Sequence, residues 1–103
     1  MLLARLSEVP PGTLKRVEHD VVSICLARAN DGSVYAIGDV CTHEESSLSE
    51  GTIEEIEVEC PAHSSRFNLR TGAVMCGPAT RGVASYTADV VGDEIYVDLP
   101  DPP

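Results

Sequence analysis

Two short motifs, each pairing a cysteine with a histidine, constrain this chain more than any other feature of its sequence. The first is Cys-Thr-His at residues 41–43, and the second is Cys-Pro-Ala-His at residues 60–63. A single Cys or His is most simply a packed or solvated side chain, and His19 is interpreted in that way. Two Cys/His pairs, each leading into a polar stretch with Ser-Ser, are not explained by packing needs alone. The pairs therefore predict an inorganic centre.

Composition limits what surrounds such a centre. The 103 residues fit one domain, 1–103. With three Tyr, one Phe and no Trp, the core must be built from aliphatic side chains, and a bound centre could add cohesion. Seventeen acidic residues against seven basic ones give a net charge of -10, which argues against binding to nucleic acid or anionic membranes. An acidic surface suits solubility or steering toward a basic partner.

The cysteine count is informative because of the expected compartment. The apolar start of the chain is interrupted by Arg5, so no signal-peptide core is expected, and no run approaches the roughly 18 apolar residues of a membrane span. A cytoplasmic location is expected, where thiols stay reduced. Four cysteines there indicate metal or redox chemistry before cross-links. Cys25, in an apolar run, is interpreted as a buried small hydrophobe.

The rest of the chain predicts strands and almost no helix. Short segments rich in β-branched residues, several of them alternating apolar with polar, are expected as strands at 13–19, 20–29, 33–40, 52–60, 85–91 and 94–100. Turn residues lie between them at 30–32, 70–72 and 92–93. The fold class predicted is all-β, a small antiparallel β sandwich or barrel. Residues 41 to about 81 are expected to form a subdomain of loops and short strands set into this scaffold.

Within the strand expected at 52–60, alternation separates two faces. Ile56, Val58 and Cys60 fall on one face, and the glutamates between them fall on the other. This places Cys60 at the end of an apolar face.

Three kinds of chemistry compete for the two pairs. A tetrahedral zinc site takes two Cys and two His, but zinc modules usually separate the ligands of one pair by two to four residues, and His43 follows Cys41 after one. A thiol nucleophile with a His base needs one pair and leaves the other unexplained. A binuclear iron–sulfur centre of the Rieske arrangement uses both pairs, because two His replace two Cys on one iron.

The sequence resembles the Rieske ferredoxins that serve bacterial aromatic-ring dioxygenases. The resemblance covers essentially the whole chain, in "SVYAIGDVCTHEESSLSEG", "ECPAHSSRFNLRTGAV", "GPAT" and the closing "GDEIYVDL". It implies a Rieske fold with an inserted cluster-binding subdomain at about 41–81 and one 2Fe-2S cluster. The ligand set implied is Cys41 and Cys60 on one iron, and His43 and His63 on the other. Pro78, in the third loop, would shield the cluster.

The same resemblance implies a function. The protein would be a monomeric one-electron carrier that accepts electrons from a flavin-containing, NAD(P)H-dependent reductase and delivers them to a terminal Rieske oxygenase. It would be a component of an enzyme system rather than the catalyst. Alternatives are a small Rieske subunit of another reductase, such as nitrite reductase, or a zinc-binding structural module.

Departures from related families refine this expectation. Rieske subunits of respiratory complexes carry an additional disulfide between the cluster loops and a membrane anchor. Here Ser46 and Ala62 stand at the disulfide positions, which favours the ferredoxin type. Cys76 stands at neither position and is expected to pack near the third loop.

Two further pairs of residues, near the ligands in the sequence, are expected to affect the potential and the docking of a partner. In high-potential relatives a Ser and a Tyr donate hydrogen bonds to sulfur, and Ser65 and Phe67 occupy those positions here. Ser65 is expected beside the cluster, with a solvent-exposed loop residue as the alternative. Glu44 and Glu45, directly after His43, are expected either to form part of a docking surface or to be a solvated charge pair.

Overall fold

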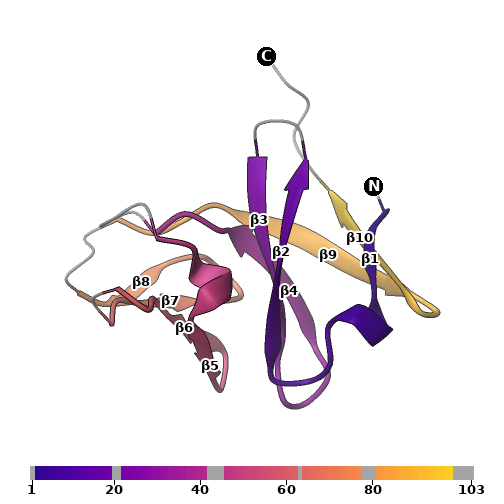
Figure 1. Cartoon of the computed structure of the whole chain (residues 1–103), viewed down its shortest axis with the longest axis horizontal. Coiled ribbons are helices and arrows are strands. Elements are labelled where there is room, and N and C mark those ends of the chain that lie inside the picture. Colours follow the sequence, from indigo (N-terminus) through magenta and orange to yellow (C-terminus); the bar gives the residue numbers. More distant parts are fainter. Residues whose placement is uncertain (1, 20–21, 42–45, 63, 78–80, 99–103) are drawn as a thin grey trace.

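The computed structural model describes residues 2–19, 22–41, 46–62, 64–77 and 81–98, and the described part is built almost wholly from β-strands (Figure 1). The strands are β1 (Leu2–Arg5), β2 (Thr13–His19), β3 (Val22–Arg28), β4 (Val34–Gly38), β5 (Thr52–Glu54), β6 (Glu57–Glu59), β7 (Arg66–Asn68), β8 (Val74–Cys76), β9 (Ser85–Val91) and β10 (Glu94–Asp98). Two single turns of 3₁₀ helix accompany them, η1 (Leu6–Glu8) and η2 (Leu48–Glu50). Among these described residues, no helix is long and apolar enough to cross a bilayer.

The strands form two antiparallel sheets. The larger has the order β1-β10-β9-β4-β3-β2, and the smaller has the order β5-β6-β7-β8. In the chain, the whole small sheet lies between β4 and β9, and Figure 1 shows it beside the long strands of the large sheet. The prediction of an all-β, antiparallel fold is confirmed.

Strands β3 and β4 form a wall that separates two cores. Ile24 and Leu26 of β3 pack on one side with Ile95 of β10, and we call this group the scaffold core. Its buried members are Ala4, Val9, Ile24, Leu26, Ala36, Ile95 and Val97. Because side chains alternate along a strand, the residues between them, Cys25 and Ala27, face the opposite side. Strand β3 is therefore buried on both faces.

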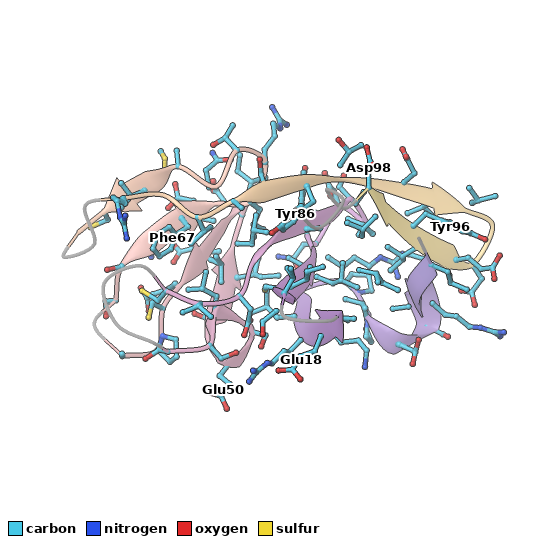
Figure 2. All side chains as sticks on the ribbon, turned by 90° about the horizontal axis from the view of Figure 1, so that it is seen from above. Glu18, Glu50, Phe67, Tyr86, Tyr96 and Asp98 are labelled. Carbon is cyan, nitrogen blue, oxygen red and sulfur yellow. The ribbon has the colours of Figure 1, made fainter. Side chains whose placement is uncertain are left out.

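The second core lies on the side of the small sheet, and we call it the site core. Its buried members are Cys25, Ala27, Ile37, Cys41, Leu48, Val58, Cys60, Phe67 and Leu69. Phe67, the one phenylalanine of the chain, comes from β7 of the small sheet and is fully buried within the molecule (Figure 2). Aliphatic residues, Phe67 and thiols thus fill this core, in line with the scarcity of aromatic residues.

Close backbone approaches attach the small sheet to its surroundings, and two glycines allow them. A Cβ at Gly51, after η2, would lie 1.9 Å from the carbonyl oxygen of Glu59. A Cβ at Gly72 would lie 2.1 Å from the carbonyl oxygen of Val83, whose amide donates to the Gly72 carbonyl at 2.8 Å. Gly72 also has φ +79°, so a side chain there would be strained as well as blocked.

The predicted strands match the observed ones unevenly. β2 and β9 have the predicted bounds, and β3, β4 and β10 lie inside predicted ranges. The single strand predicted at 52–60 is wrong, because the chain reverses at Glu55 and Ile56 to form the β5–β6 hairpin. The reversal has no glycine, and Glu55 itself takes a φ of 56°. Val58 is nevertheless buried as predicted, while Ile56 lies in the turn.

Candidate metal centre

The two cysteines of the Cys/His motifs meet in one buried region. Cys41 is 3% exposed and Cys60 is 1% exposed, and both belong to the site core with Phe67 and Leu48. They come from segments far apart in the chain, one after β4 and one after β6. The other predicted site residues His43, His63, Pro78, Glu44 and Glu45 lie outside the described residues.

Each of the two cysteine loops is closed by a backbone hydrogen bond of the same kind. The amide of Cys41 donates to the carbonyl of Ser46 at 2.9 Å, and the amide of Cys60 donates to the carbonyl of Ser65 at 2.7 Å. In each case the bond spans five residues. It fixes the cysteine at the base of a short loop whose remaining residues include the motif histidine. Such equivalent loops can present one thiol and one imidazole each.

The first loop is anchored by a buried carboxylate that the sequence reasoning missed. Asp39 is 1% exposed. Its Oδ2 accepts a hydrogen bond from the Ser47 hydroxyl at 2.5 Å, and its Oδ1 accepts one from the Ser49 amide at 2.9 Å. Its carbonyl accepts the Leu48 amide at 2.7 Å. Asp39 therefore supplies acceptors for the first amides of η2, as an N-cap residue does.

The second loop is bracketed by an ion-pair network on the outer face of the small sheet. Glu59 and Arg66, the residues on either side of the loop, lie opposite each other in the β6–β7 pair. Arg66 Nη2 lies 2.5 Å from Glu54 Oε2, its Nη1 lies 3.6 Å from Glu57 Oε1, and its Nε lies 3.4 Å from Glu59 Oε1. The Glu54 carboxylate is the main cause of a raised pKa at Arg66, with Glu59 contributing. These pairs are partly exposed, so salt weakens them.

The remaining two cysteines differ from each other. Cys25 is fully buried, as predicted, and burial, followed by the nearby Asp39 charge, raises the pKa of its thiol far above the ordinary value. Cys76 is exposed, so the expectation that it packs near the third loop is wrong. The β7–β8 pairing shifts register between Arg66 and Phe67, which places Cys76 opposite Arg66 on the edge strand. The outer face of the small sheet carries Arg66 and its glutamates.

Ser65 is buried, with no measurable exposure. The alternative that it is a solvent-exposed loop residue is therefore wrong. Phe67, two residues further, is also fully buried in the site core beside the two cysteines. Both positions predicted to tune the potential are thus buried, Ser65 at the end of the second loop and Phe67 in β7.

The donor set fits a thiolate-bound cluster. Two reduced thiols lie in one water-poor core, each on a loop of the same construction. Among the described residues there is no group of three or more His, Cys, Asp and Glu side chains that could hold a metal ion. The two motif histidines, which would complete the set of ligands, lie outside that part of the chain. The two buried thiols fit the sulfur ligands that a centre with two thiolates and two imidazoles requires.

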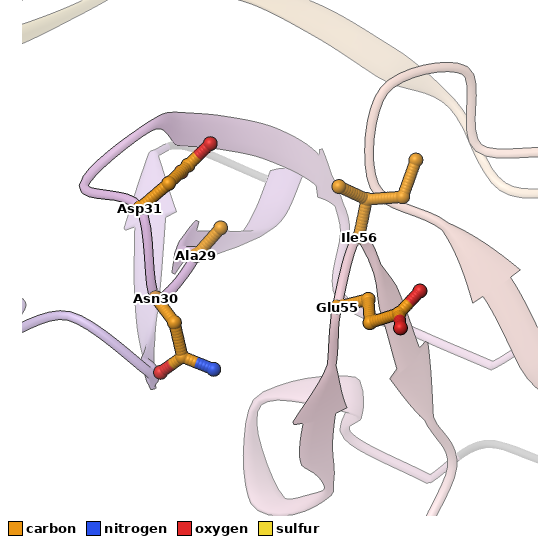
Figure 3. Close-up of a pocket in the computed structure, with 5 residues that line it drawn as sticks. All are labelled: Ala29, Asn30, Asp31, Glu55 and Ile56. Atoms are coloured by element: carbon orange, nitrogen blue, oxygen red, sulfur yellow. The ribbon is translucent and has the colours of Figure 1, made fainter.

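A separate hollow lies between the β3–β4 turn and the β5–β6 turn (Figure 3). It has a volume of about 290 Å³ and is lined by Ala29, Asn30, Asp31, Glu55 and Ile56. The Asp31 carboxylate already accepts the Ser33 amide at 2.9 Å, and this bond is the main cause of a lowered pKa at Asp31. None of the residues that line the hollow is a cysteine or a histidine, so the hollow is distinct from the cysteine loops.

The antiparallel β fold and the two buried thiols are the features expected of a small iron–sulfur protein. Residues 1–87 match the family model of the Rieske [2Fe-2S] domain. The chain belongs to the Rieske family, and its cofactor is a Rieske-type 2Fe-2S cluster.

Within the Rieske family, this chain is similar to ferredoxins of dioxygenase systems. The "3-phenylpropionate/cinnamic acid dioxygenase ferredoxin subunit" of Escherichia coli (strain K12) is 40% identical over 97 residues, covering 93% of this chain and 90% of that one. The ferredoxin of carbazole 1,9a-dioxygenase from Nocardioides aromaticivorans has a TM-score of 0.88 and 36% identity, covering 94% of both chains. A structure described as a complex of reduced oxygenase and oxidized ferredoxin in carbazole 1,9a-dioxygenase has a TM-score of 0.88 and 34% identity, covering 95% of this chain and 100% of that one.

These relatives are ferredoxin subunits of aromatic dioxygenase systems. The interpretation of this chain as an electron-transfer component, rather than the catalyst, is confirmed. The same findings exclude the two alternative interpretations of the Cys/His pairs, a zinc module and a thiol nucleophile.

Proposed function

We propose that this protein carries single electrons from a flavin-containing, NAD(P)H-dependent reductase to the terminal oxygenase of an aromatic-ring dioxygenase system. The observation that carries the proposal is the 40% identity to a dioxygenase ferredoxin subunit over nearly the full length of both chains. The relative found in complex with its oxygenase supports delivery to an oxygenase. The protein would act as a monomer in the cytoplasm.

We assign the ligands from the motifs and from the burial of the thiols. Cys41 and Cys60 would hold one iron, and His43 and His63 would hold the other, with Pro78 shielding the cluster in the third loop. The domain would span 1–103, with the cluster-binding subdomain at about 41–81. When bound, the cluster takes up and releases one electron.

The protein's own residues shape that chemistry in two ways. The site core keeps water from the thiol side, which is supported by the near-complete burial of Cys41 and Cys60. With two thiolates instead of four, the oxidised site would be neutral instead of doubly negative, so adding an electron would be less costly. The histidine ligands would therefore raise the potential above that of an all-cysteine cluster.

The ligand assignment is tested by single substitutions. His43→Ala and His63→Ala should abolish the Rieske electron paramagnetic resonance signal of the reduced protein, because each removes a ligand. Cys25→Ser and Cys76→Ser are the matched controls and should keep the signal. Loss of all iron in a control, with a normal Rieske signal in His43→Ala, would show that the assignment is wrong.

The electron-transfer role is tested with the purified partners. The reduced protein is mixed in a stopped-flow instrument with the terminal oxygenase proposed as its partner, and reoxidation of the ferredoxin is followed by visible absorption. Rapid reoxidation by the oxygenase, and rapid reduction by the reductase with NAD(P)H, are expected. Failure of both partners to exchange electrons with a protein that has a normal Rieske signal would reject this role.

A further inference from the structure

We propose that Asp39 is a positioning residue for the first cluster loop and that its buried charge lowers the reduction potential of the cluster. This inference deepens the proposed function and rests on it, since it takes Cys41 as a ligand. Asp39 lies two residues before Cys41, so the two Cα atoms are separated by at most about 7 Å of chain.

The positioning part rests on the hydrogen bonds of Asp39. Both carboxylate oxygens accept, one from the Ser47 hydroxyl and one from the Ser49 amide. The residues on either side of the loop, Val40 and Ser47, also form an isolated antiparallel bridge. Asp39 thus ties the strand that enters the loop to the residues that leave it. Removal of its carboxylate would take away the two side-chain hydrogen bonds that hold Ser47 and Ser49 beside the loop that contains Cys41.

The electrostatic part rests on burial. Asp39 is 1% exposed, so solvent screens its charge far less than that of a surface carboxylate. A negative charge in this position disfavours the arrival of an electron at a neighbouring site. Burial is the main cause of the raised pKa of the Cys25 thiol, and the nearby Asp39 charge adds to it.

Arg16 partly compensates this charge. From β2, its Nε lies 3.6 Å from Asp39 Oδ2, and its Nη2 also pairs with Glu18 at 2.6 Å. The Arg16 side chain is 51% exposed, whereas that of Asp39 is 1% exposed. Solvent therefore screens the charge of Arg16 more than it screens the charge of Asp39. Asp39 and Arg16 should consequently shift the potential in opposite directions, with Asp39 having the larger effect.

The test measures the potential of the cluster-loaded protein by voltammetry in the parent and three variants. Asp39→Asn removes the charge and keeps the shape, and we expect about a tenfold larger equilibrium constant for reduction, which is about 59 mV for one electron. Arg16→Gln should decrease that constant about threefold, or about 28 mV. Glu18→Gln is the matched control, because it removes one exposed negative charge beside the same arginine. Glu18→Gln should change the equilibrium constant for reduction less than Asp39→Asn or Arg16→Gln does.

Asp39→Ala separates the two roles. It should lose iron to a chelator several-fold faster than the parent, because the loop loses both acceptors. Asp39→Asn should restore retention of the cluster without restoring the potential. A purely structural role would change retention and leave the potential of Asp39→Asn at that of the parent.

The inference is overturned if Asp39→Asn shifts the potential no more than Glu18→Gln does. If Asp39→Asn does not assemble a cluster, Arg16→Gln decides: a lower potential supports the inference, and an unchanged or higher one overturns it. A parent protein without a Rieske signal would instead reject the proposed function.

Discussion

Ser65 is fully buried and lies at the end of the loop that begins at Cys60. Its hydroxyl is the one that we expect to affect the reduction potential most. Its carbonyl already accepts the Cys60 amide. A hydrogen bond from the hydroxyl to sulfur favours the reduced, more negative cluster. If that bond is about 1 kcal/mol stronger in the reduced state, it raises the potential by about 40 mV. With no tyrosine at position 67, we expect the parent potential near the bottom of the Rieske range, around -150 mV.

Ser65→Ala should therefore lower the potential by a few tens of millivolts, measured by voltammetry. Ser85→Ala, at an exposed serine that begins β9, serves as the control. An unchanged potential in Ser65→Ala would mean that its hydroxyl has a partner other than the cluster sulfur.

Phe67→Tyr tests the missing donor at the other tuning position. Phe67 is fully buried in the same core as Cys41 and Cys60, so an added hydroxyl enters the region of the thiols. We expect it to bond sulfur and raise the potential by a similar few tens of millivolts. Voltammetry and thermal unfolding are measured together. A lower melting temperature with no change in potential would show that the hydroxyl is buried without a partner, a cost of about 1–3 kcal/mol.

Thiol reactivity should distinguish Cys25 from Cys76. Burial and the Asp39 charge raise the pKa of Cys25, so its thiolate is scarce at any pH below that raised value. Cys76 is exposed. Iodoacetamide at pH 8 should alkylate Cys76 in the cluster-loaded protein and leave Cys25 intact, as read by mass spectrometry. Cys76→Ser should remove the labelling, and modification of Cys25 under native conditions would contradict the burial argument.

At the scale of elements, the β5–β6 hairpin carries local strain. Glu55 takes a φ of 56°, a region that costs a non-glycine residue about 1–2 kcal/mol. Glu55→Gly removes this strain but adds freedom to the unfolded chain, so a net gain of about 0.5 kcal/mol is expected. The melting temperature should rise by about 2–4 °C.

Thr52→Gly, in the adjacent strand β5, is the control for that change. It should lower the melting temperature, because glycine weakens a strand without relieving strain. If both glycine variants melt below the parent, the turn at Glu55 is not a source of strain.

The sequence predicted long elements better than short ones. β2 and β9 contain seven residues each and show their composition clearly. The strands β5 to β8 contain three residues each, which is too few for a periodic signal. The β5–β6 turn escaped prediction because glutamate and isoleucine occupy it instead of glycine or asparagine.

The two cysteines were predicted as a pair for a different reason. Cys41 and Cys60 lie in motifs that resemble the ligand signature of the Rieske family, and the structure buries both in one core. Their role as ligands stays a prediction. Asp39 did not stand out, because its partner Ser49 is ten residues away and their contact depends on how η2 folds back. A buried carboxylate is recognised by its surroundings, which a sequence pattern does not contain. Cys76 was misplaced for the same reason, since a register shift in β8 decides its exposure.

At the scale of the whole molecule, the net charge of -10 governs encounters with other proteins. We expect Glu44 and Glu45, beside His43 in the sequence, to contribute to docking on a basic partner surface. Reversal of both to lysine should slow electron transfer to the oxygenase at low ionic strength more than at high, because salt screens the attraction. Rates are measured by stopped flow across a salt series. Reversal of the exposed Asp89 and Asp93 in the β9–β10 hairpin is the charge-matched comparison.

If the two double variants slow electron transfer equally, net charge rather than a local docking surface is responsible. Equal rates for the parent and for the Glu44/Glu45 double variant at every salt concentration would exclude these residues from the interface.

The wall formed by β3 and β4 has a consequence for how the protein acquires its iron. The scaffold core contains neither Cys41 nor Cys60, whereas the site core contains both. The larger sheet can thus be complete on one side of the wall before any metal arrives. Cluster insertion would then complete the site core, which contains both thiols, rather than fold an unstructured chain. The protein would reach the assembly machinery with its larger sheet folded and Cys41 just after strand β4 of that sheet, whereas Cys60 follows β6 of the smaller sheet.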